Sequence, residues 1–253
     1  MQNSQWHLLQ TTAEELGIPL SEAEIEQYRR YATLLLEANQ RINLTAFKTL
    51  AAVVDKIILD SLTILPVVAQ HLGYDMCALR NTALHGIDIG TGAGVPGIPL
   101  LLAWPNLHLT LVESVGKKAR FLEEAVSSLR IPAEVFHGRA EMLARVPAYR
   151  QAFDLAMARA VAPLATLVEL VLPFLKIGGI AALPKGPRVF SEAEEAHYAL
   201  SALGGELAAI ESTPLKNTPE QRYIVLLRKV DATPETYPRS PGIPQKRPLS
   251  APQ

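Results

Sequence analysis

The sequence predicts an α/β protein in which a mostly parallel sheet follows a helical N-terminal extension. From residue 84 onward, short apolar runs alternate with segments of helical periodicity, which favours a parallel sheet covered by helices. Residues 1–80 show helical spacing and no strand-like alternation. Four glycines within residues 90–97 join the first predicted strand to the next helix, where open α/β sheets commonly bind ligands. We therefore expect an extension at 1–80, a sheet domain at 81–230 and a tail at 231–253.

The extension begins with a recognisable helix start. Ser21 and Glu24 have the spacing of a capping box, and apolar side chains follow at helical intervals. Tyr28 and Tyr31 lie on this helix and are expected to pack in the core. A second helix is predicted over residues 50–65, and it should end ahead of the proline that follows.

The sheet domain has seven candidate strands. The last two of these runs have no helix between them, so they are expected to pair as an antiparallel hairpin at the sheet edge. The predicted strands are residues 84–89, 107–112, 133–136, 153–157, 179–183, 207–210 and 223–227, and the predicted helices are residues 98–104, 117–129, 141–146, 164–175 and 188–203.

The glycine-rich loop predicts a nucleoside-containing ligand. Gly90, Gly92 and Gly94 allow a tight turn and let a ligand lie against bare backbone. Val95 follows directly, so the loop lacks the Gly-x-Gly-x-x-Gly spacing of dinucleotide sites. With Asp88 in the preceding strand, the loop resembles the S-adenosylmethionine loop of Rossmann-like methyltransferases. A buried carboxylate is costly unless it has a partner, and this cofactor offers it an amino group.

Glu113 supplies the second half of this prediction. It follows the strand at residues 107–112, about 20 residues beyond the loop, where an acidic side chain suits a ribose with free hydroxyls. The loop and this carboxylate together describe a pocket for a nucleoside-containing cofactor.

Composition limits the classes of function. The 253 residues are 49% hydrophobic, with a net charge of −1 and a pI of about 6.6, so no general nucleic-acid-binding charge is present. The single cysteine, Cys77, excludes a disulfide within the chain. The histidines show no metal-ligand spacing, so no metal is expected. No run reaches the roughly 20 apolar residues of a membrane span, and no secretory signal is present, so we expect a cytoplasmic monomer that does not bind membranes.

The tail from residue 231 differs in composition from the rest. It contains six prolines, which exclude a regular helix or a central strand. Residues 214–253 hold seven basic and three acidic side chains. Two interpretations stay open: a tail that packs against the sheet domain, and a basic arm near a substrate.

Several segments together resemble the ribosomal RNA small subunit methyltransferase G family, also called glucose-inhibited division protein B. The most specific match is the run Tyr-Pro-Arg-x-Pro-Gly-Ile-Pro-x-Lys-x-Pro-Leu, which begins at Tyr237. The family usually has a histidine three residues before the Asp of Asp-Ser-Leu, and this chain has Ile57 there. The matching segments are residues 43–45, 59–62, 88–99, 159–164, 185–186 and 237–249.

The resemblance implies a Rossmann-like class I methyltransferase fold with an N-terminal helical extension. It also implies methyl transfer from S-adenosylmethionine to guanine N7 in the decoding region of 16S ribosomal RNA, free or in the small ribosomal subunit. Carried over by position, it adds cofactor contacts to those of the loop and Glu113. These are Ala140, Glu141 and Arg159.

Roles toward the RNA are expected for other residues. Catalytic or pocket roles are predicted for Arg159, Lys185, Asn43 and Asp60, and phosphate contacts for Arg239, Lys246 and Arg247. Guanine N7 carries a lone pair and no proton, so its methylation needs no general base. Two alternatives stay open: a nucleotide-dependent oxidoreductase that uses the same loop, and a non-catalytic RNA-binding protein.

Overall fold

The computed structural model describes residues 2–213 and 221–251. The chain divides into two compact units, Met1–Ala83 with Thr91–His137, and Leu84–Gly90 with Gly138–Gln253. Its seven strands have the order β3-β2-β1-β4-β5-β7-β6. The predicted α/β class, with a mostly parallel sheet and an antiparallel edge hairpin, is confirmed.

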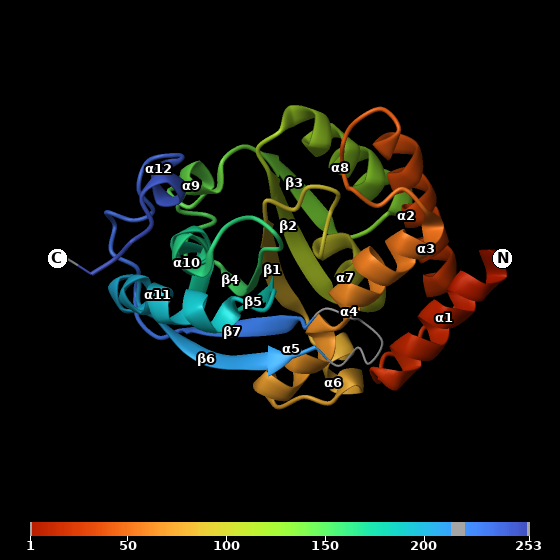
Figure 1. Cartoon of the computed structure of the whole chain (residues 1–253), viewed down its shortest axis with the longest axis horizontal. Helices are drawn as coiled ribbons and strands as arrows, with labels where there is room; N and C mark the ends of the chain where they lie inside the picture. The colour runs from red at the N-terminus through yellow and green to blue at the C-terminus, as the bar shows by residue number, and fades with distance from the viewer. Residues whose placement is uncertain (1, 214–220, 252–253) are drawn as a thin grey trace. The chain divides into compact units, whose positions relative to one another are not determined.

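The first unit contains the helical extension and two parallel strands (Figure 1). Its strands are β2 (Leu107–Glu113) and β3 (Ala133–His137). Its helices are α1 (Gln2–Glu15), α2 (Glu22–Asn39), α3 (Leu50–Val53), the π-helix η1 (Val54–Leu59), α4 (Asp60–Leu62), α5 (Ile64–Leu72), α6 (Met76–Asn81), α7 (Gly97–Ala103) and α8 (Gly116–Leu129).

The predicted capping box is present at the start of α2. The Ser21 hydroxyl accepts a hydrogen bond from the Glu24 amide, and the Glu24 carboxylate accepts one from the Ser21 amide. Tyr28 and Tyr31 are both fully buried, as expected from their position on the apolar face. The sequence did not predict α1 as a separate helix, because the apolar face of this helix is weak.

The helix predicted over residues 50–65 is longer than expected. Helical backbone continues to Leu72, with one turn of π-helix inside it, and ends at Gly73, where φ is +74°. Pro66 therefore does not end the helix. It lies in the first turn of α5, where a backbone N–H has no obligatory partner, so the ring costs little there.

The second unit contains five strands and the C-terminal tail. Its strands are β1 (Leu84–Ile89), β4 (Phe153–Met157), β5 (Leu175–Lys185), β6 (Gly205–Ser212) and β7 (Tyr223–Lys229). Its helices are α9 (Ala140–Leu143), α10 (Leu164–Val171), the 3-10 helix η2 (Leu172–Phe174), α11 (Val189–Ala202) and α12 (Ile243–Lys246).

The strands of this unit lie where they were predicted, but β5, β6 and β7 are longer than expected. β1 pairs in parallel with β4, and β4 with β5, while β7 pairs antiparallel with both β5 and β6. The helix predicted over residues 164–175 gives way to η2 at Leu172, because Pro173 follows, and Leu175 already belongs to β5. α10 and α11 pack against each other beside these strands (Figure 1).

The tail packs against α9 and α10, with α12 as its one helical turn (Figure 1). Main-chain groups of residues 233–244 receive or donate hydrogen bonds along most of this length. Across the part of the chain that the structure describes, none of the helices combines the length and the apolar character needed to cross a membrane.

Candidate active site

The glycine-rich loop is anchored on the end of β2. The Thr91 amide donates to the Val112 carbonyl at 3.2 Å, and the Thr91 carbonyl accepts from the amides of Gly94 and Val95 at 2.9 and 2.8 Å. Gly92 and Gly94 have φ values of +58° and +85°, a region that favours glycine. This turn sets the loop backbone at the carboxyl end of β2.

Glu113 holds the same loop by its side chain. Its Oε2 atom accepts a hydrogen bond from the Gly92 amide at 3.0 Å, and Oε1 accepts one from the Val115 amide at 2.7 Å. The residue is 5% exposed. Each carboxylate oxygen has two lone pairs, so each keeps one acceptor position after these bonds. The carboxylate is thus oriented by the backbone and still able to accept from a pair of ribose hydroxyls.

Helix α2 also contacts this loop region. The Tyr31 hydroxyl donates to the Ala93 carbonyl at 2.9 Å, and the Tyr28 hydroxyl donates to the Pro99 carbonyl at 2.7 Å. The sequence predicted both tyrosines as core residues and gave no sign of these hydrogen bonds. The extension therefore supports the loop directly, through buried polar contacts within the first unit.

Asn43 and Asp60 also belong to the first unit. Asn43 is exposed, in a segment that Asn39 shapes by accepting from the amides of Leu44 and Thr45 at 2.9 and 3.0 Å. Asp60 is 5% exposed and begins α4, directly after the π-helix. Single π-helical turns occur often at functional sites.

The π-helix also contains the position where this chain departs from the resemblance. Ile57 is 2% exposed, and its carbonyl accepts a hydrogen bond from the Ser61 hydroxyl at 2.6 Å. An isoleucine side chain cannot donate or accept a proton. Residue 57 therefore cannot act as an acid or a base in this chain.

In the second unit, Asp88 and Gly90 stand at the carboxyl end of β1. Asp88 is fully buried. Gly90 has a φ of +68°, and a Cβ atom there would lie 2.8 Å from Cγ2 of Val161. The absent side chain therefore lets the segment after β4 approach the segment after β1, at the strand ends where α/β folds place ligands.

The segment after β4 carries Arg159. This side chain is half-buried, and the next residue, Ala160, has a φ of +56°. A non-glycine residue in this region is strained, and such strain is common at functional sites.

Lys185 fixes the same segment from β5. Its ammonium donates to the Ala162 carbonyl at 3.0 Å and pairs with the Glu192 carboxylate at 2.5 Å. Glu192 also accepts from the Leu164 amide at 2.9 Å. The sequence did not single out Glu192, which joins Lys185 to the start of α10. The predicted catalytic role of Lys185 stays a prediction beside this structural one.

Ala140 and Glu141 begin α9, and both are buried. Oε1 of Glu141 accepts hydrogen bonds from Nη2 of Arg139 at 2.7 Å and from the Gly242 amide at 2.8 Å. Burial raises the pKa of this carboxyl, but the hydrogen bonds from Arg139 and Gly242 outweigh it, so the pKa lies below its usual value. Glu141 is thus held as an anion.

The three tail residues predicted to contact RNA have different surroundings. Arg239 pairs with the fully buried Glu169, with Nη2 and Oε2 2.6 Å apart. Lys246 and Arg247 are exposed. Glu169 was visible in the sequence as the one charge in an apolar stretch, which in principle signals a buried partner. The RNA contact of Arg239 stays a prediction, and the ion pair gives it an additional structural role.

Comparison with known proteins decides the family. The family model for rRNA small subunit methyltransferase G matches residues 24–224, well over half of the chain. The chain belongs to this family.

Curated relatives of the family cover nearly the whole chain. The ribosomal RNA small subunit methyltransferase G of Pelotomaculum thermopropionicum is 42% identical over 94% of this chain and 95% of its own length. The protein of the same name from Chloroflexus aggregans is 40% identical over 98% of this chain and 99% of its own length, so the match extends into the tail. The resemblance drawn from the motifs is confirmed.

A solved structure supports the fold. The branched-chain polyamine synthase C9 mutein from Thermus thermophilus, solved with 5'-methylthioadenosine, superposes with a TM-score of 0.53 at 15% identity. The match covers 81% of this chain and 66% of the synthase chain. At this identity the likeness concerns the fold alone.

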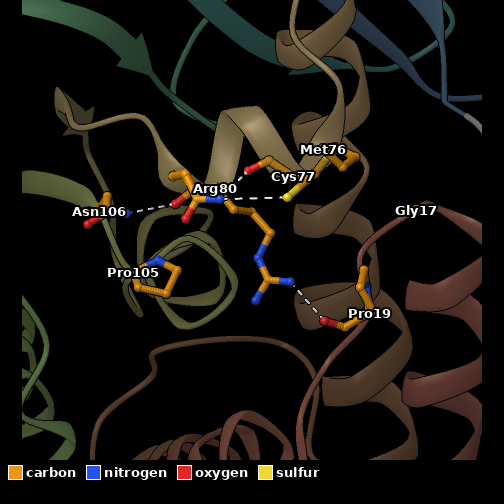
Figure 2. Close-up of a pocket in the computed structure, with 8 residues that line it drawn as sticks. Gly17, Pro19, Met76, Cys77, Arg80, Pro105 and Asn106 are labelled. Carbon is orange, nitrogen blue, oxygen red and sulfur yellow. Dashed lines mark hydrogen bonds between the residues drawn. The ribbon is translucent and has the colours of Figure 1, made fainter.

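A surface pocket in the first unit contains none of the predicted site residues. It has a volume of about 410 Å³, and Figure 2 shows Arg80 at its centre, donating to the Pro19 carbonyl at 2.8 Å. The Asn106 side chain donates to the Arg80 carbonyl at 3.0 Å. The lining residues are Gly17, Pro19, Met76, Cys77, Arg80, Asn81, Pro105 and Asn106. Over the described ranges, no group of three or more His, Cys, Asp or Glu side chains is placed to hold a metal ion.

Proposed function

We propose that this member of the methyltransferase G family transfers a methyl group from S-adenosylmethionine to guanine N7 in 16S ribosomal RNA. Its substrate is the RNA, free or within the small ribosomal subunit. The observation that carries the proposal is family membership over almost the whole chain, with the glycine loop and Glu113 intact. The family match disfavours the oxidoreductase alternative, and the intact loop disfavours a non-catalytic RNA-binding protein.

The residues present suit the cofactor. The Glu113 carboxylate, oriented by the Gly92 and Val115 amides, would accept from the ribose hydroxyls. The buried Asp88 would accept from the amino group of the methionine part. The loop from Gly90 to Val95, together with Ala140, Glu141 and Arg159, would complete the contacts.

The chemistry needs alignment more than proton transfer. When bound, the cofactor supplies an electrophilic methyl carbon on a positively charged sulfur. The protein has to hold guanine N7 in line with that carbon and exclude water. Alignment of this kind lowers a barrier by up to roughly 7–11 kcal/mol. The proposed mechanism therefore needs no acid/base pair.

The positive charge of the sulfonium limits where basic side chains can lie in this mechanism. A cation beside the sulfonium would raise the energy of the bound cofactor by like-charge repulsion. Lys185 avoids this cost because Glu192 neutralises it. We propose that Arg159 faces cofactor or RNA oxygen atoms, and that Asn43 and Asp60 shape the guanine pocket.

The test is methylation of 16S ribosomal RNA and of small subunits by the purified protein, with mass spectrometry of the RNA. One new 7-methylguanosine in the decoding region is expected. The Gly92→Val variant serves as the negative control, because a Cβ atom would obstruct the ligand at the loop. A thermal shift with NAD but none with S-adenosylhomocysteine would instead favour the oxidoreductase.

The absence of a general base gives a second test. The rate of methyl transfer at saturating cofactor should show no limb governed by a deprotonating residue between pH 6 and pH 9. A sigmoid increase that disappears in a variant of one titratable side chain would contradict the mechanism.

A further inference from the structure

The C-terminal strap, residues 233–247, is held through its main chain by charged side chains of the segment 139–169. Two arginines hold its first half. Arg150 donates to the carbonyls of Thr233 and Tyr237 at 2.8 and 2.9 Å. Arg145 donates to the carbonyl of Glu235 at 3.4 Å and to that of Pro238. Proline removes backbone donors, so a proline-rich segment has carbonyls in excess, and arginine donors supply the missing partners.

An ion pair holds the middle of the strap. The fully buried Glu169 on α10 accepts from the Arg239 amide at 2.7 Å, from Nε at 3.0 Å and from Nη2 at 2.6 Å. Arg239 Nη2 also donates to the Arg247 carbonyl at 2.7 Å, which joins the middle of the strap to its end. The Thr166 hydroxyl, also on α10, donates to the Pro244 carbonyl at 3.2 Å.

The strap reaches the candidate cofactor site at Gly242. The Gly242 amide and Arg139 share one carboxylate oxygen of Glu141. Glu141 is 2% exposed, and its carboxylate points to the strap and to Arg139. This side chain therefore links the strap to the start of α9, which carries the two positions predicted to contact the cofactor.

We propose that the strap is a positioning element for the cofactor, with Glu169, Arg239 and Gly242 as positioning residues that act through Glu141 on α9. This inference rests on the proposed function, because it takes Ala140 and Glu141 as part of the cofactor site. α9 has only four residues, so its own hydrogen bonds hold it weakly. The strap supplies the order that so short a helix lacks. Coupling of this kind is reciprocal: cofactor binding should stabilise the strap by the same factor.

The principal test compares two charge-neutral double variants by calorimetry with S-adenosylhomocysteine. Glu169→Gln/Arg239→Gln removes both charges together, so no buried carboxylate is left unpaired. Glu206→Gln/Arg228→Gln makes the same change at facing positions of the β6–β7 hairpin. The first variant should bind at least about 5-fold more weakly than the wild type, within the usual range of coupling between sites, and the second should be unchanged.

Enzyme kinetics separate positioning from general damage. In the strap variant, KM for S-adenosylmethionine should rise while kcat at saturating cofactor and saturating RNA stays close to wild type. Hydrogen exchange of the unmodified protein gives a second, variant-free measurement. S-adenosylhomocysteine should slow exchange of the Gly242 amide and of the α9 amides, and leave β6 unchanged.

Two negative results have different meanings. A wild-type protein that does not bind S-adenosylhomocysteine would overturn the proposed function and this inference with it. A wild-type protein that binds normally, with unchanged affinity in the folded strap variant or no protection at Gly242, would overturn only the inference. The strap would then serve only to cover α9 and α10.

Discussion

At the scale of single residues, three buried glutamates of this protein are held by backbone amides. Glu113 accepts from two amides, Glu141 from the Gly242 amide, and Glu169 from the Arg239 amide. None of the three is more than 5% exposed. Burial of a charge is costly unless hydrogen bonds replace water, so each of these side chains fixes the segment that supplies its donor. The consequence is that carboxylates organise the loop and the strap.

Glu113 offers the most direct test at the residue scale. In Glu113→Ala, the hydrogen bonds to the ribose are lost, and affinity for S-adenosylhomocysteine should fall by about 1–3 kcal/mol. Calorimetry measures the change. Glu113→Gln keeps one acceptor oxygen and should lose less. Equal affinity in the wild type and the alanine variant would exclude Glu113 from the cofactor site.

Lys229 gives a prediction about pH. It is fully buried at the end of β7, where its ammonium donates to the Leu203 carbonyl at 2.6 Å and to the Thr233 hydroxyl. Burial, and next the nearby Arg150, lower its pKa from 10.5 to about 8. Between these two pKa values, Lys229 is therefore more protonated in the unfolded chain than in the folded protein. Its contribution to the free energy of unfolding then rises with pH across that range.

Urea unfolding at pH 7.5, 8.5 and 9.5 measures this contribution. The free energy of unfolding of the wild type, relative to Lys229→Met, should rise with pH across the series. Parallel pH curves for the two proteins would mean that Lys229 keeps an ordinary pKa. Thr233 still donates to the Leu203 carbonyl in the variant, so that carbonyl keeps a partner.

At the scale of elements, the glycine loop and the strap are specified in different ways. The loop is specified by local conformation, because a Cβ atom on Gly94 would clash with the Ile98 side chain and its φ is +85°. The strap is specified by partners far away in sequence. The Arg239–Glu169 pair joins residues 70 positions apart.

The ion pair makes a prediction about stability. Arg239→Ala leaves the Glu169 carboxylate buried without its cation, which should lower the free energy of unfolding by about 3–5 kcal/mol. Lys246→Ala, an exposed charge in the same strap, is the matched control and should change stability by less than about 0.5 kcal/mol. Chemical denaturation measures both, and similar values for the two variants would show that the pair adds nothing.

At the scale of the whole molecule, the chain combines a neutral overall charge with a locally basic tail. RNA binding must then depend on a local patch. Lys246 and Arg247 are exposed and are the tail's best candidates for phosphate contacts. Arg239 belongs to the ion pair with Glu169, so a variant that removes all three basic residues would also disturb the strap.

The salt dependence of RNA binding tests the two exposed residues. Each phosphate contact releases roughly 0.7–0.9 counterion, so Lys246→Ala/Arg247→Ala should reduce the slope of log affinity against log salt by about 1.4–1.8. Affinity for S-adenosylhomocysteine should stay unchanged. An identical slope in variant and wild type would show that Lys246 and Arg247 make no phosphate contacts.

Much of the fold could be predicted because local patterns determine it. The strands at Leu84–Ile89 and Phe153–Met157 lie where the apolar runs place them, and the β6–β7 hairpin follows from the missing helix between two such runs. The helix ends were predicted less well. Pro66 was expected to end a helix and lies in the first turn of α5, whereas the helix predicted through Pro173 gives way to a 3-10 turn there, so a proline's position in the turn decides its effect.

The family, the order of the strands along the chain and the position of the glycine loop could be inferred from the sequence alone, because spacing and glycine content are local properties of the chain. Which charged side chains are partners became apparent only in the folded chain. Glu169 with Arg239, Glu141 with Gly242, and Lys185 with Glu192 are brought together by folding. Pairing of this kind depends on distance and burial in three dimensions, and no local pattern in the sequence records either quantity.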